Sequence, residues 1–154
     1  MEEEIKKLIE DYKEIRERTI KFLEKVPEEK WTWKPHELLG SFGMQVRHMS
    51  TSQKSYIEGI KKEKIDFSNK EFDKEIETNK EKAINRLKEL DKELFELIEI
   101  IDSNKKVIFS DGVSGITEET LENVLHYLTE HEFYHQGIFT CYGRLAGLGK
   151  FLFM

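Results

Sequence analysis

Mostly hydrophobic side chains recur along most of the chain at the spacing of one face of an α-helix. Between residues 2 and 25 they alternate three- and four-residue steps, which is the period of an amphipathic helix. This face comprises Ile5, Leu8, Ile9, Tyr12, Ile15, Thr19, Phe22, Leu23 and Val26. We predict a first helix that ends near Pro27, because proline cannot continue a helix. The most regular pattern, from residue 76 to 101, predicts the third helix.

Local start and stop signals place two more helices. Ser41 is a suitable N-cap for a second helix that runs to about Lys62. The fourth helix is expected to start at residues 117–120, with two glutamates of that segment in its first turn, where they favour the positive end of the helix dipole. The glycines at 147 and 149 should end this helix.

The segments between the predicted helices carry loop signals. Residues 31–36 are aromatic and contain proline, so they are expected to form a loop whose tryptophans cover one end of the core. Residues 66–69 are typical of a turn. Within the connection 105–115, residues 107–109 are expected to be briefly extended before a turn at 111–112.

Composition agrees with this pattern. The chain has 154 residues, 38% of them hydrophobic and 36% charged, with 2 prolines, a balance that suits long amphipathic helices. No internal repeat is visible. We therefore predict an all-α fold, a four-helix bundle that forms a single domain over residues 1–154.

Charge and cysteine content exclude several classes of function. The net charge is −6, and lysines are scattered among glutamates, so no basic surface for nucleic acid is visible. Cys141 is the single cysteine and cannot form an internal disulfide. No apolar run reaches the ~18 residues of a membrane span, and the N-terminal residues do not have the pattern of a signal peptide. The expected protein is soluble and cytoplasmic, without nucleic-acid or membrane partners.

Two histidines interrupt the apolar stripe of the fourth helix. His131 and His135 stand four residues apart, so their side chains lie ~6 Å apart on one helical face. The stripe around them contains Leu121, Val124, Leu125, Leu128, Ile138, Phe139, Tyr142 and Leu145. Two hydrogen-bonded core histidines are one interpretation. A pair at this spacing inside an apolar stripe favours the other, which is two ligands of one metal ion.

Residues 131–135 also match the HExxH signature of zinc peptidases, in which Glu132 would activate water. That class needs a third ligand beyond the motif, but the chain has Ile138 and Cys141 where the extended peptidase pattern has glycine and histidine. No Asp, Glu or His occurs from residue 136 to the end, and Cys141 lies on the far side of the helix from His135. A third ligand must therefore come from upstream, and a peptidase is the less favoured alternative.

The second helix supplies a candidate for that ligand. His48 lies beside the apolar stripe, on a strip of small polar residues that leaves room for a ligand or water: Ser41, Gln45, Ser52, Ser55 and Gly59. The alternative is a histidine on a polar flank. His36 lies in the aromatic loop, and His126 is rotated about 180° from His135, so neither is a good candidate.

A di-iron site is a further alternative, because Glu132 and His135 form one Glu-x-x-His motif. That architecture needs a second such motif and two more glutamates on facing helices. The matching tetrapeptide in the second helix, residues 45–48, begins with glutamine instead of glutamate. A site for one metal ion fits better.

The motifs together resemble the DinB-like superfamily, which includes the bacillithiol transferases of the YfiT type. They are WKP at 33–35, SFGMQVRH at 41–48, HEFYHQG at 131–137 and YGRLAG at 142–147, in this order along most of the chain. The resemblance implies a four-helix bundle, usually dimeric, with three histidines that bind a divalent metal such as nickel or zinc. It also implies that a low-molecular-weight thiol could be a cosubstrate.

By position, the ligands that the resemblance implies are His48, His131 and His135, the three residues already chosen from spacing. We also expect a homodimer, because the first helix and the apolar residues 151–154 offer more apolar surface than one bundle needs.

Three neutral imidazoles would leave an open position on the metal, which is typical of catalytic sites. A divalent metal lowers the pKa of a bound thiol or water, giving a nucleophile for a small electrophile. Glu132 or Tyr134 could orient either partner, although Glu132 could equally be a surface residue next to Lys or Arg. We therefore predict a metal-dependent thiol S-transferase or hydrolase of small molecules. The alternatives are a non-catalytic metal- or ligand-binding stress protein, and a plain bundle whose dimer interface is its purpose.

Overall fold

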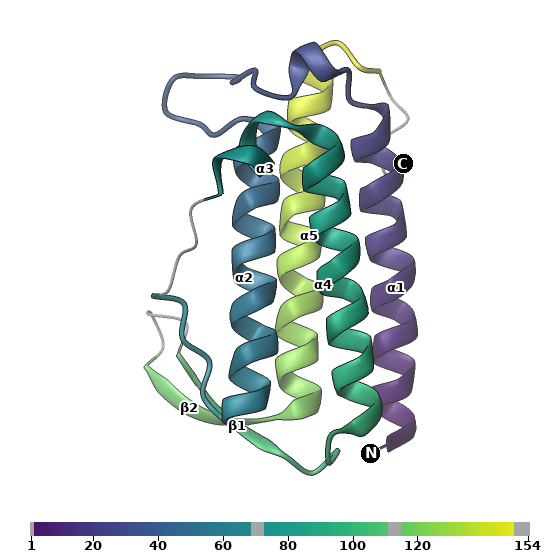
Figure 1. Cartoon of the computed structure of the whole chain (residues 1–154), viewed down its shortest axis with the longest axis vertical. Coiled ribbons are helices and arrows are strands. Elements are labelled where there is room, and N and C mark those ends of the chain that lie inside the picture. The colour runs from purple at the N-terminus through teal and green to yellow at the C-terminus, as the bar shows by residue number, and fades with distance from the viewer. Residues whose placement is uncertain (1, 69–72, 111–114, 150–154) are drawn as a thin grey trace.

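Four long helices lie side by side in the computed structural model, which describes residues 2–68, 73–110 and 115–149 (Figure 1). The long helices are α1 (Glu2–Lys25), α2 (Phe42–Lys62), α4 (Lys80–Ile100) and α5 (Leu121–Leu145). The short elements are the 3-10 helix η1 (Glu28–Lys30), α3 (Lys74–Thr78), β1 (Lys106–Ser110) and β2 (Ile116–Thr120). The prediction of an all-α bundle is confirmed, with a small β-hairpin at one end.

The helices run up, down, down and up in chain order (Figure 1). Both α1 and α2 contact α4 and α5, so the four helices stand in a square with α1 diagonally opposite α2. As a result, α2 and α5 are antiparallel neighbours, and the first turns of α2 lie beside the second half of α5. A hydrogen bond of 3.4 Å from Gln45 Nε2 to the Tyr142 hydroxyl joins them there.

Side-chain caps set the helix boundaries. Ser41 caps α2 by accepting a hydrogen bond of 3.1 Å from the Met44 backbone N–H, as predicted. The third predicted helix is broken at Asn79, whose backbone is extended and whose side chain accepts from the Lys82 N–H at 3.0 Å. Ile76 therefore belongs to the separate helix α3, although it still packs into the core. An asparagine cap inside a periodic apolar pattern explains this difference.

The predicted start of the last helix is wrong. Residues 116–120 form β2, which pairs with β1 in antiparallel register, so Glu118 and Glu119 stand opposite Ile108 and Val107. Thr120 is the N-cap, and α5 begins at Leu121. The extended segment predicted at 107–109 supplies the backbone partners that keep these glutamates in a strand. The turn expected at 111–112 lies outside the described residues.

The core has two apolar clusters, one at each end of the bundle. The cluster near the hairpin contains Tyr12, Leu94 and Leu121. The other contains Phe42, Phe139 and Trp31. Trp31 is 1% exposed, and its indole N–H donates to the Ile76 carbonyl at 3.1 Å, so the predicted cover over this end is confirmed. Among the described residues, no helix is long and apolar enough to cross a membrane.

We expect Gly43→Ala to destabilise the fold. A Cβ at this position would overlap the carbonyl oxygen of Glu77 and the indole nitrogen of Trp31. Forced overlap in a packed core costs about 1–3 kcal/mol, which urea unfolding can measure. Gly137→Ala is the matched control, since nothing lies within 4 Å of its Cβ and alanine is favoured in a helix by about 0.5–1 kcal/mol. Equal stability of the two variants would contradict this packing.

Candidate metal centre

Three histidine side chains from two helices converge at one point. His131 and His135 lie one turn apart on α5, and their Nε2 atoms are 3.2 Å apart. His48 reaches them from the antiparallel helix α2, with its Nε2 atom 3.3 Å from that of His131. The three imidazoles offer ligand nitrogens that all lie within 4.8 Å of one another. This separation suits three ligands of one ion.

The cluster is open on one side. His135 is fully buried, whereas His131 is half-buried and His48 is exposed. A pocket of about 390 Å³ lies on the open side and is lined by His48 and His131. A small molecule could therefore reach the point where the ring nitrogens converge, while the protein interior closes the other side.

The environment keeps the imidazoles of His131 and His135 neutral. Burial is the main cause that lowers the pKa of His131 to about 4 and that of His135 to about 3, and the neighbouring histidines lower both pKa values further. Neutral imidazole is the form that binds metals. The donor set therefore fits a divalent ion such as nickel or zinc.

These pKa values predict that metal-free protein loses stability as the pH falls. The unfolded chain binds protons at its histidines below about pH 6.5, whereas folded His131 and His135 stay neutral until about pH 4 and 3. The stability from neutral histidines is present above pH 6.5 and is lost as the pH falls through this window. Urea unfolding of chelator-treated protein between pH 7 and 5 tests this. A His131→Ala/His135→Ala variant should show a flatter profile, and parallel profiles would contradict the prediction.

The other candidates lie away from the cluster. His36 is exposed in its loop, where its Nδ1 accepts from the Leu38 N–H at 3.1 Å. His126 lies on α5, 3.8 Å from the Glu122 carboxylate. Cys141 is exposed and is not part of the group of potential ligands found among the described residues. The preference for His48 over these residues agrees with the geometry.

Glu132 is buried beside Arg16 and does not lie on the surface. Its side chain is 2% exposed, and its Oε2 lies 3.3 Å from Nη2 of Arg16 on α1. The surface position considered from the sequence is therefore wrong, although the partner is an arginine. Burial raises the pKa of Glu132, and Arg16 opposes that rise. The catalytic role of Glu132 stays a prediction.

Tyr134 stands at the edge of the cluster. It is 63% exposed, and its ring centroid lies 5.2 Å from that of His135 in an edge-on arrangement. The side chain is thus open to solvent beside His135. Its catalytic role also stays a prediction.

Arg16 is the centre of a buried polar network that the sequence reasoning missed. It donates to Gln53 Oε1 at 2.9 Å and lies 3.6 Å from an oxygen of Asp91, and Gln53 in turn donates to Asp91 at 2.8 Å. Tyr12 accepts a short hydrogen bond from the same guanidinium. The signal was available, because Arg16 stands four residues after Tyr12 on the apolar face of the first helix.

Several polar atoms of this interior have no hydrogen-bond partner among the residues that the structure describes: Arg16 Nε and Nη1, Glu132 Oε1 and His135 Nδ1. Buried polar atoms of this kind usually bind ordered water. In metal sites, the second ring nitrogen of a ligating histidine usually donates to a carboxylate, carbonyl or water. A partner of this kind at Nδ1 would fix the orientation of the His135 ring.

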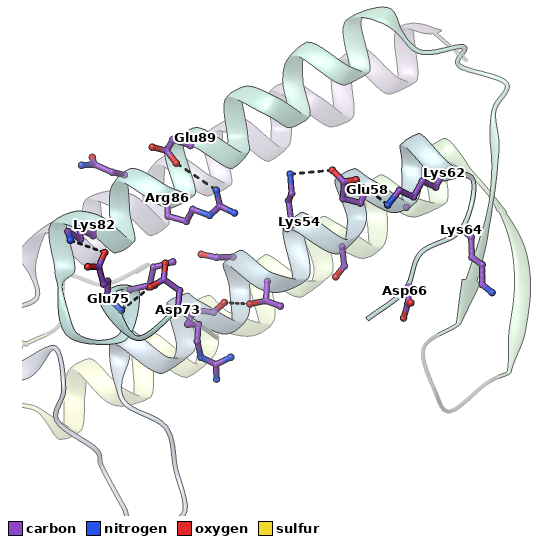
Figure 2. A pocket seen from close by; sticks show the side chains of 17 residues that line it. Lys54, Glu58, Lys62, Lys64, Asp66, Asp73, Glu75, Lys82, Arg86 and Glu89 are labelled. Atoms are coloured by element: carbon purple, nitrogen blue, oxygen red, sulfur yellow. Dashed lines mark hydrogen bonds and ion pairs between the residues drawn. The ribbon is translucent and has the colours of Figure 1, made fainter. Parts of the chain in front are cut away.

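A larger hollow of about 1170 Å³ lies between α2 and the start of α4 (Figure 2). Its charged lining residues largely pair with one another. These ion pairs include Lys54–Glu58 at 3.3 Å, Arg86–Glu89 at 3.8 Å and Lys82–Glu75 at 2.8 Å (Figure 2). These side chains pair with one another and do not converge on one point, as the histidines do. The histidine cluster is therefore the better candidate for a functional site, although this hollow is larger.

Comparison with known proteins agrees with the fold and the motifs. A DinB-like protein from Bacillus subtilis has a solved structure with a TM-score of 0.63 and 19% sequence identity, covering 94% of each chain. At this identity the likeness shows the fold. No curated protein matches the chain. The family model of the DinB superfamily matches residues 11–139, which include all three clustered histidines. The chain belongs to the DinB superfamily.

Proposed function

We propose that His48, His131 and His135 bind one divalent ion, nickel or zinc, and that the site transfers a thiol to a small electrophile or hydrolyses it. The observation that carries this proposal is the convergence of three Nε2 atoms beside an open pocket. Two of the imidazoles are held neutral by burial. Three protein ligands are typical of catalytic sites, whereas structural zinc sites use four.

A bound ion of this kind lowers the pKa of a thiol or water that binds to it. In the transfer reaction, the thiol loses its proton to solvent, its sulfur bonds to the electrophilic carbon, and a halide or epoxide oxygen leaves that carbon with the bonding electrons. We propose that Tyr134, whose exposed ring lies beside His135, orients the electrophile or its leaving group. Glu132 could accept a proton only through Oε1, since Oε2 faces Arg16.

One observation favours a second candidate, a non-catalytic metal- or ligand-binding stress protein. The acidic residue next to the cluster in sequence, Glu132, is engaged by Arg16 and buried. A site without a ready proton acceptor can bind metal without turnover. The same pairing removes support from the peptidase alternative, which needs this glutamate to face the metal.

Metal analysis and an activity screen separate these candidates. Protein purified without a histidine tag would be loaded with nickel or zinc and assayed with thiols against epoxides and alkyl halides. Loss of the electrophile that a chelator abolishes, and that His48→Ala lacks, supports the transferase when the thiol is consumed with it and the hydrolase when it is not. Stoichiometric metal without any turnover supports the non-catalytic candidate, and absence of metal binding contradicts both.

We also propose a homodimer. Of its two sequence-based grounds, the apolar face of α1 is largely buried within the bundle, and residues 151–154 lie outside the described residues. Exposed apolar side chains on α5, among them Phe133 at 49% and Leu145 at 68%, offer an alternative surface. Analytical ultracentrifugation should give about twice the 18.3 kDa of one chain. A mass of one chain across micromolar concentrations would contradict the dimer.

A further inference from the structure

The pocket beside the histidines extends away from them toward the β-hairpin. His48 and His131 line one end, and Tyr56, Phe67 and Phe109 line the other. Its volume of about 390 Å³ lies within the range of small-molecule sites. Between the two ends it is lined by short polar side chains of α2: Thr51, Ser52 and Ser55. The lining thus changes from ligand nitrogens to aromatic rings within one pocket.

The aromatic end is built from rings that hold one another in place. Phe67 meets Tyr56 edge-on at a centroid distance of 5.4 Å and meets Phe109 edge-on at 6.0 Å. Phe109 stacks on Tyr127 of α5 at 4.9 Å. These rings come from α2, the segment after it, β1 and α5, so four parts of the chain fix their positions. A preorganised wall of this kind loses little conformational entropy when a ligand binds.

Packing in the core leaves two of these rings partly exposed. Phe67 and Phe109 are half-buried, in contrast to Tyr56, which is 5% exposed. Tyr56 also stacks on Phe109 at 6.4 Å, yet Phe67 and Phe109 both remain partly exposed and both line the pocket. Aromatic faces pack well against flat apolar groups, with offset or edge-on rings. This end of the pocket therefore suits a planar ring.

The charges exclude one class of ligand. Among the described residues that line this pocket, Arg47 is the charged side chain and none carries a carboxylate. Arg47 is also paired with Glu77 at 2.6 Å. A cationic ligand would find no carboxylate among these lining residues, so the aromatic rings lack the acidic partner of a cage for an ammonium group. A neutral or anionic aromatic molecule fits.

We propose that the pocket binds a small molecule with a planar aromatic ring, which packs against Phe67 and Phe109 and directs a sulfur or oxygen donor toward the histidines. The substrate class is then an aryl or arylalkyl thiol or electrophile. The orientation of the donor rests on the proposed metal-dependent function. The aromatic subsite does not, because its rings are held by contacts with one another and not by the histidines.

Two pairs of probes test the subsite by calorimetry and ligand-observed NMR. With zinc-loaded protein, benzyl mercaptan should bind about tenfold or more tightly than ethanethiol, since one ring contact and its buried area contribute at least ~1.4 kcal/mol. Phe109→Leu, which keeps an apolar side chain, should remove most of this preference and leave ethanethiol affinity unchanged. Phe133→Leu is the matched control, because this exposed ring lies outside the pocket. Equal binding of both thiols, or equal loss of both in Phe109→Leu, would overturn the subsite.

The second pair separates this inference from the metal. With metal-free protein, benzyl alcohol should give NMR saturation transfer that Phe109→Leu abolishes, and ethanol should give none. If zinc fails to bind but this signal is present, the proposed function fails and the subsite stands. If zinc binds but benzyl alcohol gives no signal that depends on Phe109, the subsite is wrong and the proposed function stands.

Discussion

Replacing any one of His48, His131 and His135 by alanine should weaken nickel or zinc binding by about two orders of magnitude or more. Loss of an outer-shell partner alone typically costs 10–100-fold in metal affinity, and these side chains supply the ligand atoms themselves. His48→Ala is the cleanest variant, because the side chain is exposed and its loss leaves the core intact. Competition titrations with a chromophoric chelator would measure the dissociation constants.

The chain offers matched controls for this experiment. His36 and His126 are exposed and take no part in the cluster. Their alanine variants should bind metal as the unmodified protein does. If either control loses metal as readily as His48→Ala, the ion is bound elsewhere and the assignment of the three ligands is wrong.

The second large effect is expected from Arg16→Met, which removes the cation of the buried network. Glu132 and Asp91 would remain in the interior, and both already have pKa values raised by burial. Removing one partner of a buried ion pair costs about 3–5 kcal/mol, because the other charge is left uncompensated. Urea unfolding at pH 7 should show this loss of stability.

The pH dependence identifies the cause of that loss. Without Arg16, the carboxylates of Glu132 and Asp91 can relieve their burial by taking up protons. Their folded pKa values would rise further above those of the unfolded chain, so stability should be greater at low pH and decrease as the pH rises through the folded values. The deficit of Arg16→Met should shrink from pH 7 to pH 5. Arg18→Met, at an exposed position on the same helix, should change stability little. An equal deficit at both pH values would contradict the electrostatic cause.

The sequence was informative about the ligands because each leaves a local signal. His131 and His135 interrupt an apolar stripe at a spacing of one turn, and His48 lies among small polar residues. What spacing could not decide is whether α2 and α5 run parallel or antiparallel. The structure answers this through packing of whole helices, and the antiparallel arrangement is what brings His48 to His131.

The boundaries that the sequence missed depend on competing backbone partners. Asn79 can cap a helix as well as lie within one, and in the structure its side chain caps α4 while α3 packs separately against α2. Glu118 and Glu119 suit a first helical turn, but strand β1 offers them a ladder of backbone hydrogen bonds. The helix and strand propensities of single residues carry no information about pairing with a distant segment, so they could not predict these boundaries.

The parts around the ligands were harder to predict for a similar reason. Arg16 and Asp91 are charged residues on apolar faces, and their burial depends on their meeting across the bundle. Phe67 and Phe109 lie in a connection and a strand, far from the histidine motifs in sequence. Only the return of these segments along α2 places them in the same pocket as His48.

If the three histidines hold one ion together, the metal stoichiometry of the protein must depend on them. Protein purified without a tag would be reconstituted with nickel or zinc, desalted and analysed by elemental mass spectrometry, beside the His131→Ala/His135→Ala variant. We predict one ion per chain in the unmodified protein and none in the double variant, whose remaining ligand is His48. One ion per chain in the double variant would show that these histidines are not the metal site.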